Sequence, residues 1–437
     1  MKKLYVCLLY LLFLTSLLGL PCAEASTICV SGSSRLTREN QSAIENTFHA
    51  RYPDVQILWQ DISGDVKQAM LVQDGTVDIY FVSSRFGELQ QLTKKGYYVD
   101  LSSSALLSER VALLHERWLP LVTDGTAICA YPWSVAMGPL CCWDDEVANT
   151  LGLTRPTDRI TMSDLLAGER DVAALDDERY AFMHNGSNNP LIESAFDIYK
   201  YQMLATTGVL KYDTEAFRTL LKQLDAYTTE VDPEASGPVS VCSASGTLSG
   251  NDLENVQRYL PMTIDRADAP AIGAYLECLF INPYTANPEA ALALMETMTA
   301  YQDEMEFAAL SAAIEPILDS RYEEKIADYQ QLIEQYRALI ASDEQEQYRE
   351  FYEGEMARCE QKIANQSRYL LTQEAIDDYQ QKILPYVFLL GNSIYETYDI
   401  DMELFRTYDQ YIYGLIDDDH FLEKMDNKLM MMAEEQQ

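Results

Sequence analysis

Apolar and polar positions near the start of the chain fall into short blocks of two kinds. Apolar runs at residues 27–30, 55–59 and 77–82 have the length and composition of strands, and the intervening segments 38–52 and 66–71 have the spacing of amphipathic helices. Strand and helix in strict alternation predict a parallel sheet with right-handed crossovers. The loops after the strands then share one edge of the sheet, where α/β proteins bind ligands.

A second pattern, at residues 319–368, predicts a helical hairpin. Apolar and aromatic side chains recur every three or four positions from Tyr322 to Ile340, and a similar stripe runs from Tyr348 to Ile363. Polar residues interrupt the two stripes, so we expect two helices joined by a turn. We expect both stripes to pack on the rest of the protein; the alternative is a tyrosine-rich surface for a partner.

The first 25 residues differ in kind from the rest. Lys2 and Lys3 precede an apolar stretch at 4–20, and small residues follow up to Ala25, which is the pattern of a secretory signal peptide. A retained signal anchor is the alternative. Cys22 also permits a lipid anchor, but the residues before it fit that signal poorly, so we favour cleavage after Ala25. The protein is then secreted to the extracellular face of the cell envelope.

Charge and cysteine content narrow the class further. The formal net charge is -37, and removal of the leader, with two lysines and one glutamate, leaves -38. A chain this acidic repels phosphate backbones, which argues against nucleic acid as a partner. Of nine cysteines, Cys7 and Cys22 belong to the leader, and the other seven show no CxxC spacing. They are expected to be buried thiols rather than a disulfide framework.

No catalytic or metal-binding constellation stands out. The chain has four histidines and lacks the serine-hydrolase, zinc-protease, phosphate-loop and EF-hand patterns. Two carboxylate groups, Asp399 with Asp401 and the run 417–419, lie near expected helix starts, where capping accounts for them. We therefore predict no enzyme activity, no metal and no cofactor.

Several short segments share their order and composition with one family of proteins. They are Asp78-Ile79-Tyr80, Tyr131-Pro132, Cys142-Trp143-Asp144, Leu151-Gly152-Leu153 and Phe280-Ile281-Asn282-Pro283, with a closing helix at 421–432. In this order they resemble the bacterial extracellular solute-binding proteins of ABC transporters, sugar-type and family 1-like.

The resemblance implies a two-lobed α/β fold like that of periplasmic binding proteins, each lobe a mainly parallel sheet flanked by helices. Lobe 1 is expected at residues 26–130 plus 272–300, and lobe 2 at 131–271 plus 301–437 with the helical hairpin added. Such proteins close over a solute by hinge motion, and a membrane permease recognises the closed form.

Sugar recognition needs aromatic faces and polar groups in a dry cleft. The candidate ligand-binding residues, which lie on the expected rim or in polar loops, are Ser33, Ser34, Trp59, Ser83, Ser84, Arg85, Trp133, His184, Asn185 and Asn188. Each has a structural alternative: Trp133 could pack in a core, Arg85 could pair with a carboxylate of the protein, and the asparagines could serve turns.

The sequence therefore predicts the substrate-binding component of an ABC importer. It would act as a monomer that captures a small solute, above all a carbohydrate, and delivers it to an ABC permease. Two other classes stay open. A secreted polysaccharide hydrolase would need paired carboxylates across one cleft, and a surface interaction protein would be built on the helical hairpin.

Overall fold

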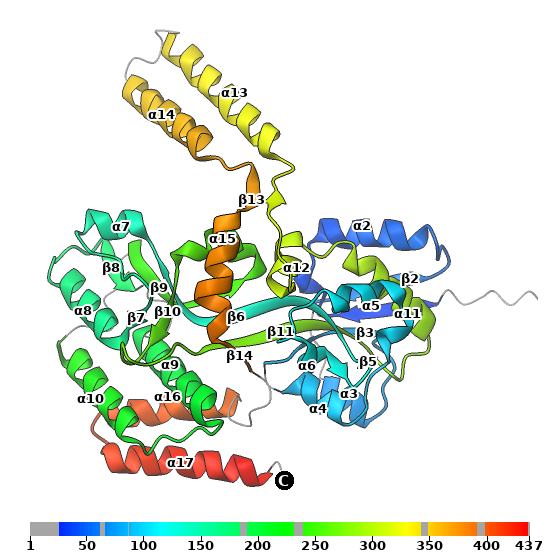
Figure 1. Ribbon diagram of the computed structural model, residues 1–437, viewed down its shortest axis with the longest axis horizontal. Coiled ribbons are helices and arrows are strands. Elements are labelled where there is room, and N and C mark those ends of the chain that lie inside the picture. The colour runs from blue at the N-terminus through cyan, green and yellow to red at the C-terminus, as the bar shows by residue number, and fades with distance from the viewer. Residues whose placement is uncertain are drawn as a thin grey trace, which may run out of the picture.

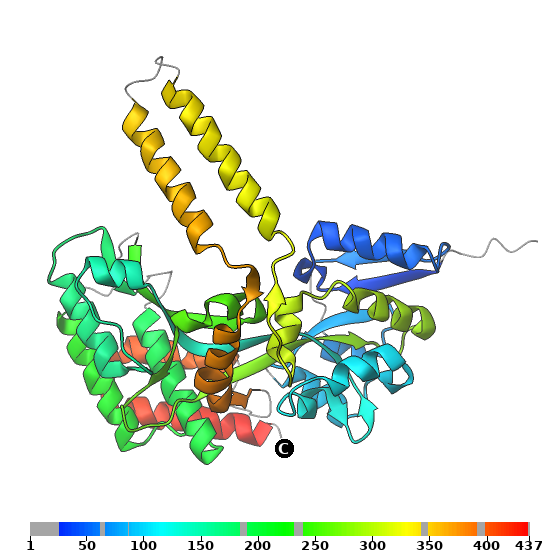
Figure 2. The same cartoon turned by 45° about the horizontal axis from the view of Figure 1, so that its top comes forward.

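The computed structural model describes residues 26–61, 66–85, 87–183, 190–230, 239–341, 348–390 and 398–435. Two α/β bodies lie side by side, and long strands run from one into the other (Figure 1). A pair of helices projects away from both (Figures 1 and 2). Within the described ranges, no helix combines the length and hydropathy needed to cross a bilayer.

The first body is built on a small parallel sheet. Strands β1 (Thr27–Ser31), β2 (Gln56–Gln60) and β3 (Ile79–Ser83) pair in the order β2-β1-β3. Helix α2 (Arg38–His49) begins where the Thr37 side chain accepts a hydrogen bond from the Asn40 amide. The other elements of this body are η1 (Ser33–Arg35), α3 (Val66–Leu71), α4 (Glu88–Lys94), η2 (Leu101–Ser103), α5 (Ala105–Ala112), α6 (Leu119–Val122), β4 (Thr123–Asp124), β5 (Ala127–Ile128) and α11 (Pro288–Thr299).

Three long strands carry the sheet across to the second body. Strand β11 (Ile272–Ile281) pairs antiparallel with β3 and with β6 (Tyr131–Trp143). Strand β9 (Val239–Ser249) pairs with β6 farther along. The full order is β2-β1-β3-β11-β6-β10-β7, with β8, β9 and β14 attached, so ten strands form one continuous sheet.

The second body surrounds the far end of this sheet. Its strands are β7 (Ile160–Thr161), β8 (Tyr180–Met183) and β10 (Tyr259–Thr263), and its helices are α7 (Asp145–Thr150), α8 (Met162–Ala173), α9 (Pro190–Thr207), α10 (Glu215–Glu230), α16 (Tyr398–Ile412) and α17 (Asp418–Glu435). The last two helices pack beneath α9 and α10 (Figure 1).

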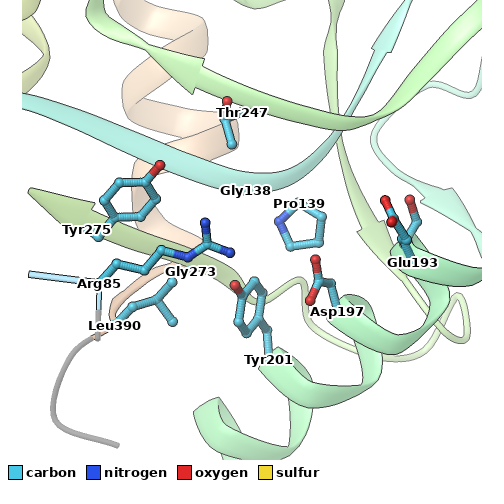
Figure 3. A pocket seen from close by; sticks show the side chains of 11 residues that line it. Arg85, Gly138, Pro139, Glu193, Asp197, Tyr201, Thr247, Gly273, Tyr275 and Leu390 are labelled. Carbon is cyan, nitrogen blue, oxygen red and sulfur yellow. The ribbon is translucent and has the colours of Figure 1, made fainter. Parts of the chain in front are cut away.

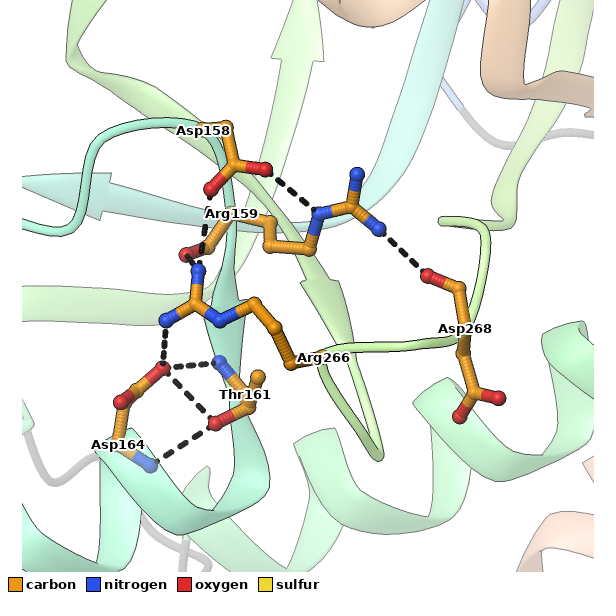
Figure 4. Close-up of polar contacts among 6 residues, drawn as sticks. All are labelled: Asp158, Arg159, Thr161, Asp164, Arg266 and Asp268. Carbon is orange, nitrogen blue, oxygen red and sulfur yellow. Dashed lines mark hydrogen bonds and ion pairs between the residues drawn. The ribbon is translucent and has the colours of Figure 1, made fainter.

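A network of arginines and aspartates ties down one corner of the second body (Figure 4). Thr161 caps α8 in a reciprocal capping box with Asp164. Arg266 bridges Asp158 at 3.0 Å and Asp164 at 3.1 Å, so the loop after β10 is fastened to the start of α8. All of these partners are partly exposed, and each pair therefore stabilises the fold only modestly.

Each body has its own hydrophobic core. The first gathers side chains from β1, β3, α2 and α11 together with β11 along its whole length and β6 as far as Leu140. The second gathers the far end of β6 with α8, α9, α10, α16 and α17. The molecule is therefore two packed units joined by strands rather than one fused core.

A layer of short elements covers one face of the crossing strands. They are η3 (Gly250–Arg258), α12 (Glu304–Leu310), α15 (Gln373–Asp378), η5 (Tyr379–Ile383), η6 (Leu384–Tyr386) and β14 (Val387–Leu389). Tyr379 donates a hydrogen bond to the Ala309 carbonyl and contacts the Met137 sulfur. Gly250 lets η3 approach α12 closely, because a Cβ there would lie 2.3 Å from the Cα of Glu306.

The projecting pair consists of α13 (Tyr322–Ala341) and α14 (Arg349–Asn365), which lie inside the segment expected to form a hairpin. A two-stranded ribbon, β12 (Ile317–Leu318) with β13 (Tyr369–Leu371), joins the pair to the body. The expectation that both apolar stripes pack on the rest of the protein is wrong. The two helices contact each other, with Tyr336 stacked on Tyr352. The pair stands clear of both bodies (Figure 2).

Candidate functional site

The two faces of the crossing strands differ in exposure. In β6, Val135 and Met137 are buried under the covering layer, while Ser134, Ala136 and Gly138 between them are only partly buried. Successive side chains of a strand point to opposite faces. The second face of β6 therefore carries only small side chains and is left open between the two bodies.

A pocket of about 200 Å³ lies on this open face (Figure 3). Its floor comes from the crossing strands, with Gly138 and Pro139 of β6 and Gly273 and Tyr275 of β11, beside Thr247 of β9. The remaining lining residues are Arg85, Glu193, Ser194, Asp197, Tyr201 and Leu390. The pocket therefore draws on the loop after β3 in the first body and on α9 in the second.

Arg85 reaches into the pocket from the end of β3. Its guanidinium carbon lies 5.5 Å from the centre of the Tyr275 ring, within the range of a cation–π contact. Burial lowers the pKa of Arg85, but the neighbouring tyrosines, led by Tyr201, and aspartates raise it, and the result lies above the usual value. Arg85 is therefore a fixed positive charge whose head group extends toward α9 (Figure 3).

Helix α9 presents the carboxyl group of Asp197 to the pocket, and Lys200 of the same helix fixes its position. The Nζ atom of buried Lys200 lies 3.1 Å from an oxygen of Asp197, and Asp401 of α16 is 3.0 Å from the same Nζ. Burial lowers the pKa of Lys200, but these two carboxylates raise it, and it lies well above the usual value. Lys200 is therefore charged, and its ion pair fixes the position of the Asp197 carboxyl group beside Tyr201.

A second polar group lies along the same rim, at the ends of β1 and β3. Arg35 approaches Glu277 of β11 at 3.3 Å. Burial raises the pKa of Glu277, and Arg35 and Ser83 oppose that shift without cancelling it. Glu277 and Tyr275 are two positions apart on one strand, so both belong to the open face of the crossing strands.

The predicted serines and tryptophans are engaged within the protein. Ser33 and Ser34 donate to the side chain and the backbone of Asp61, and Ser83 accepts a hydrogen bond from the Arg85 amide. Ser84 is buried and accepts from the Leu276 amide, which fastens the loop after β3 to β11.

The two tryptophans make packing contacts. Trp59 donates to Glu45 of α2 at 2.6 Å. Trp133 is 8% exposed and meets Phe81 edge-on with ring centres 5.7 Å apart. His184, Asn185 and Asn188 lie outside the described residues. Among the predicted residues that the structure describes, Arg85 is the one that lines the pocket.

Sequence reasoning missed most of the pocket, although a signal was present. Glu193, Asp197 and Tyr201 recur every four positions on α9, which places three polar or aromatic side chains on one face of a helix that follows a polar loop. Tyr275 and Glu277 interrupt an apolar strand at a spacing of two. Both patterns mark polar faces on otherwise buried elements.

The arrangement favours binding over bond cleavage. Glu193 and Asp197 both project from α9, so they approach the pocket from one side, whereas a glycosidase places its two carboxyl groups on either side of the scissile bond. Asp417 near the start of α17 accepts from the His420 amide, as expected of a cap. In the part of the chain that the structure describes, no cluster of three or more His, Cys, Asp or Glu side chains could hold a metal.

A second hollow, of about 220 Å³, lies between α2 and α11. Its lining includes Phe48, Arg51, Tyr52 and Glu296. All of these residues belong to the first body, so a ligand there would not touch both halves of the molecule.

Solved structures of ABC solute-binding proteins share the fold along nearly the whole chain. A substrate-binding protein from Listeria monocytogenes in complex with cycloalternan has a TM-score of 0.55 at 10% identity, covering 93% of this chain and 98% of that one. A solute-binding protein from Thermotoga lettingae bound to α-D-tagatose has 0.57 at 15%, covering 94% and 100%. One from Agrobacterium vitis with D-mannitol has 0.54 at 11%, covering 94% and 99%.

At these identities the likeness establishes the fold. The predicted two-lobed α/β fold class, with its resemblance to ABC solute-binding proteins, is confirmed, and the similar structures are binding proteins rather than enzymes. No protein-family model matches the chain, and no curated protein has a similar sequence.

Proposed function

We propose that this protein is the substrate-binding component of an ABC importer, which captures a carbohydrate between its two lobes and delivers it to a membrane permease. The observation that carries the proposal is the pocket on the open face of the crossing strands. Arg85 enters it from the first body, Asp197 and Tyr201 enter it from α9 of the second, and Tyr275 lies in its floor. A solute held there contacts both bodies at once.

Such a pocket suits capture by closure. The bodies have separate cores and are joined by β6, β9 and β11, so the joining strands can bend while each core stays intact. A ligand that contacts both bodies favours the closed form by the free energy of its added contacts. In this proposal the lobes are residues 26–130 plus 272–300 and residues 131–271 plus 301–437.

The similar structures agree with this chemistry. Three of them hold cycloalternan, α-D-tagatose and D-mannitol. The pocket offers carboxylates, a guanidinium and hydroxyl groups, which pair with sugar hydroxyls as acceptors, donors and both. We further propose that the chain acts as a monomer outside the cell, after its first 25 residues are removed.

Thermal-shift screening of the mature chain tests the proposal. A ligand at 100 times its dissociation constant stabilises the folded state by about 2.7 kcal/mol, which is a clear shift in melting temperature. We expect a shift with at least one member of a panel of monosaccharides, alditols and oligosaccharides. Arg85→Gln should reduce that shift, and Arg51→Gln in the α2–α11 hollow should leave it unchanged.

One result would contradict the carbohydrate assignment, and another would contradict the assigned pocket. If the whole sugar panel leaves the melting temperature unchanged while spermidine raises it, the solute is a polyamine. If the two arginine variants respond alike to a sugar that binds, the ligand does not occupy the pocket between the lobes.

A further inference from the structure

Among the residues that the structure describes, the charges in and behind the pocket wall nearly balance, which bears on the kind of solute that the pocket takes. Arg85 and Lys200 provide two positive charges, and Glu193, Asp197 and Asp401 provide three negative ones. An anionic solute would meet Arg85 but also two carboxylates on the pocket wall. A cationic solute would meet these carboxylates but also Arg85. In both cases a charge of the same sign faces the solute, and such like-charge contacts weaken binding.

The hydrogen-bonding groups of the pocket match the hydroxyl groups of a solute rather than any single charged group. The carboxylate oxygens of Asp197 accept hydrogen bonds, and Arg85 only donates them. Tyr201, Tyr275 and Thr247 carry hydroxyls that can do either. A hydroxyl group also both donates and accepts, so a polyol can satisfy an acceptor on one wall and a donor on the other.

The size and the aromatic content of the pocket indicate a short solute. A volume of about 200 Å³ lies below the ~300 Å³ at which pockets for drug-sized ligands begin. Among the described lining residues the aromatic rings are Tyr201 and Tyr275, and Arg85 already stacks on Tyr275. Successive sugar rings would lack successive stacking surfaces.

We propose that the pocket selects one uncharged sugar ring or alditol, recognised by Asp197 and Arg85 from opposite walls, with Lys200 as the positioning residue that holds Asp197. This inference rests on the proposed function and narrows its substrate class. Lys200 does not line the pocket. It acts through Asp197, and its second partner, Asp401, links the site to α16.

Isothermal titration of the full mature chain tests the solute class. The probes are neutral hexoses and D-mannitol, D-glucuronate, D-glucosamine and maltotriose. We expect one neutral monosaccharide or alditol to bind at least about tenfold more tightly than either charged sugar or the trisaccharide, as the loss of one hydrogen bond to a charged group implies.

Variants test the assigned roles. Asp197→Asn should weaken binding of the neutral ligand about 10- to 100-fold and should narrow its advantage over D-glucuronate, because one repelling carboxylate is gone. Lys200→Met should weaken it similarly, and Lys200→Arg should restore most of the affinity. Arg266→Gln, which breaks ion pairs elsewhere in the second body, is the matched control and should bind as the parent chain does.

The two proposals fail in different ways. Tighter binding of maltotriose, D-glucuronate or D-glucosamine overturns the inference about the solute class and leaves the capture of a carbohydrate standing. Equal affinity in Asp197→Asn and the parent chain overturns the assigned recognition groups. If none of these probes nor a wider sugar panel binds, the proposed function falls together with the inference.

Discussion

Two pairs of helices in this molecule look alike in sequence and behave differently in the fold. Helices α16 and α17 bury a row of side chains against the second body, where Phe421 stacks on Phe217 with ring centres 5.8 Å apart. Within α13 and α14, all of whose residues the structure describes, only Ile333 and Cys359 are buried. Amphipathic periodicity alone does not reveal whether a stripe faces a body or another stripe.

The two pairs differ in what their apolar side chains contact. In the projecting pair the two helices pack on each other, where Tyr336 stacks on Tyr352 at 5.9 Å and Arg337 reaches Glu360 at 3.8 Å, while Phe351 stays exposed. The docked pair also packs aromatic side chains against α9 and α10. Polar ties add to them, such as the 2.7 Å ion pair of Arg218 with Asp419.

The largest expected effect is the loss of a docking side chain. Phe421→Ala removes a fully buried ring from the second core and should lower the free energy of unfolding by about 3–5 kcal/mol. Ile333→Ala should destabilise only the projecting pair and change the main transition by less than about 1 kcal/mol, because that pair can unfold locally. Chemical denaturation followed by circular dichroism gives both values. Equal losses in the two variants would mean that the projecting pair is part of the cooperative unit.

The next effect comes from a buried carboxyl at the foot of the projecting pair. Burial raises the pKa of Glu306 on α12 to about 7, although the backbone of Gly250 donates to it. The folded state therefore binds more protons than the unfolded state between about pH 4.5 and 7, and its stability falls as the pH rises through that window. The full contribution amounts to about 3 kcal/mol.

Glu306→Gln should flatten this pH dependence. Denaturation midpoints at pH 5, 6, 7 and 8 check the prediction. Glu169 is the matching group of the second body, since burial raises its pKa to about 7 as well, and Glu169→Gln gives the comparison in the docked region. If the stability of the parent chain and of both variants rose at the same rate from pH 5 to pH 7, the assignment of the pH dependence to Glu306 would be contradicted.

The smallest expected effect comes from the largest change to the chain, which is the removal of the projecting pair. Leu318 and Tyr369 are paired across the ribbon, so residues 319–368 can be replaced by an Asn-Gly turn without moving the body. Because the projecting pair contacts neither core, the melting temperature and the sugar affinity should stay close to those of the parent chain. A marked loss of either would show that the pair supports a lobe or the pocket.

The sequence predicted the fold better than the site. The strands at 27–30 and 77–82 could be predicted because apolar runs between turn residues are local signals. Arg85 could be found because it follows a parallel strand. The sequence did not indicate that Asp197 and Tyr275 line one pocket. They lie 78 positions apart, on α9 and on the crossing strand β11, and only the tertiary fold brings them together.

The tryptophans show the opposite case, in which the sequence selects residues that do not line the pocket. Trp59 and Trp133 lie near the expected rim, and this position and their aromatic rings made them candidates for stacking on a sugar. Whether a ring faces a cleft or a core depends on strand register, and the register of β6 turns Trp133 toward Phe81.

A crystal structure of the chain grown with its tightest-binding neutral sugar tests the central claim most directly. The account predicts electron density for one sugar ring above Gly138, with Asp197 and Arg85 each within hydrogen-bonding distance of its hydroxyls. Density in the α2–α11 hollow or along α13 and α14, with the pocket between the lobes empty, would contradict it.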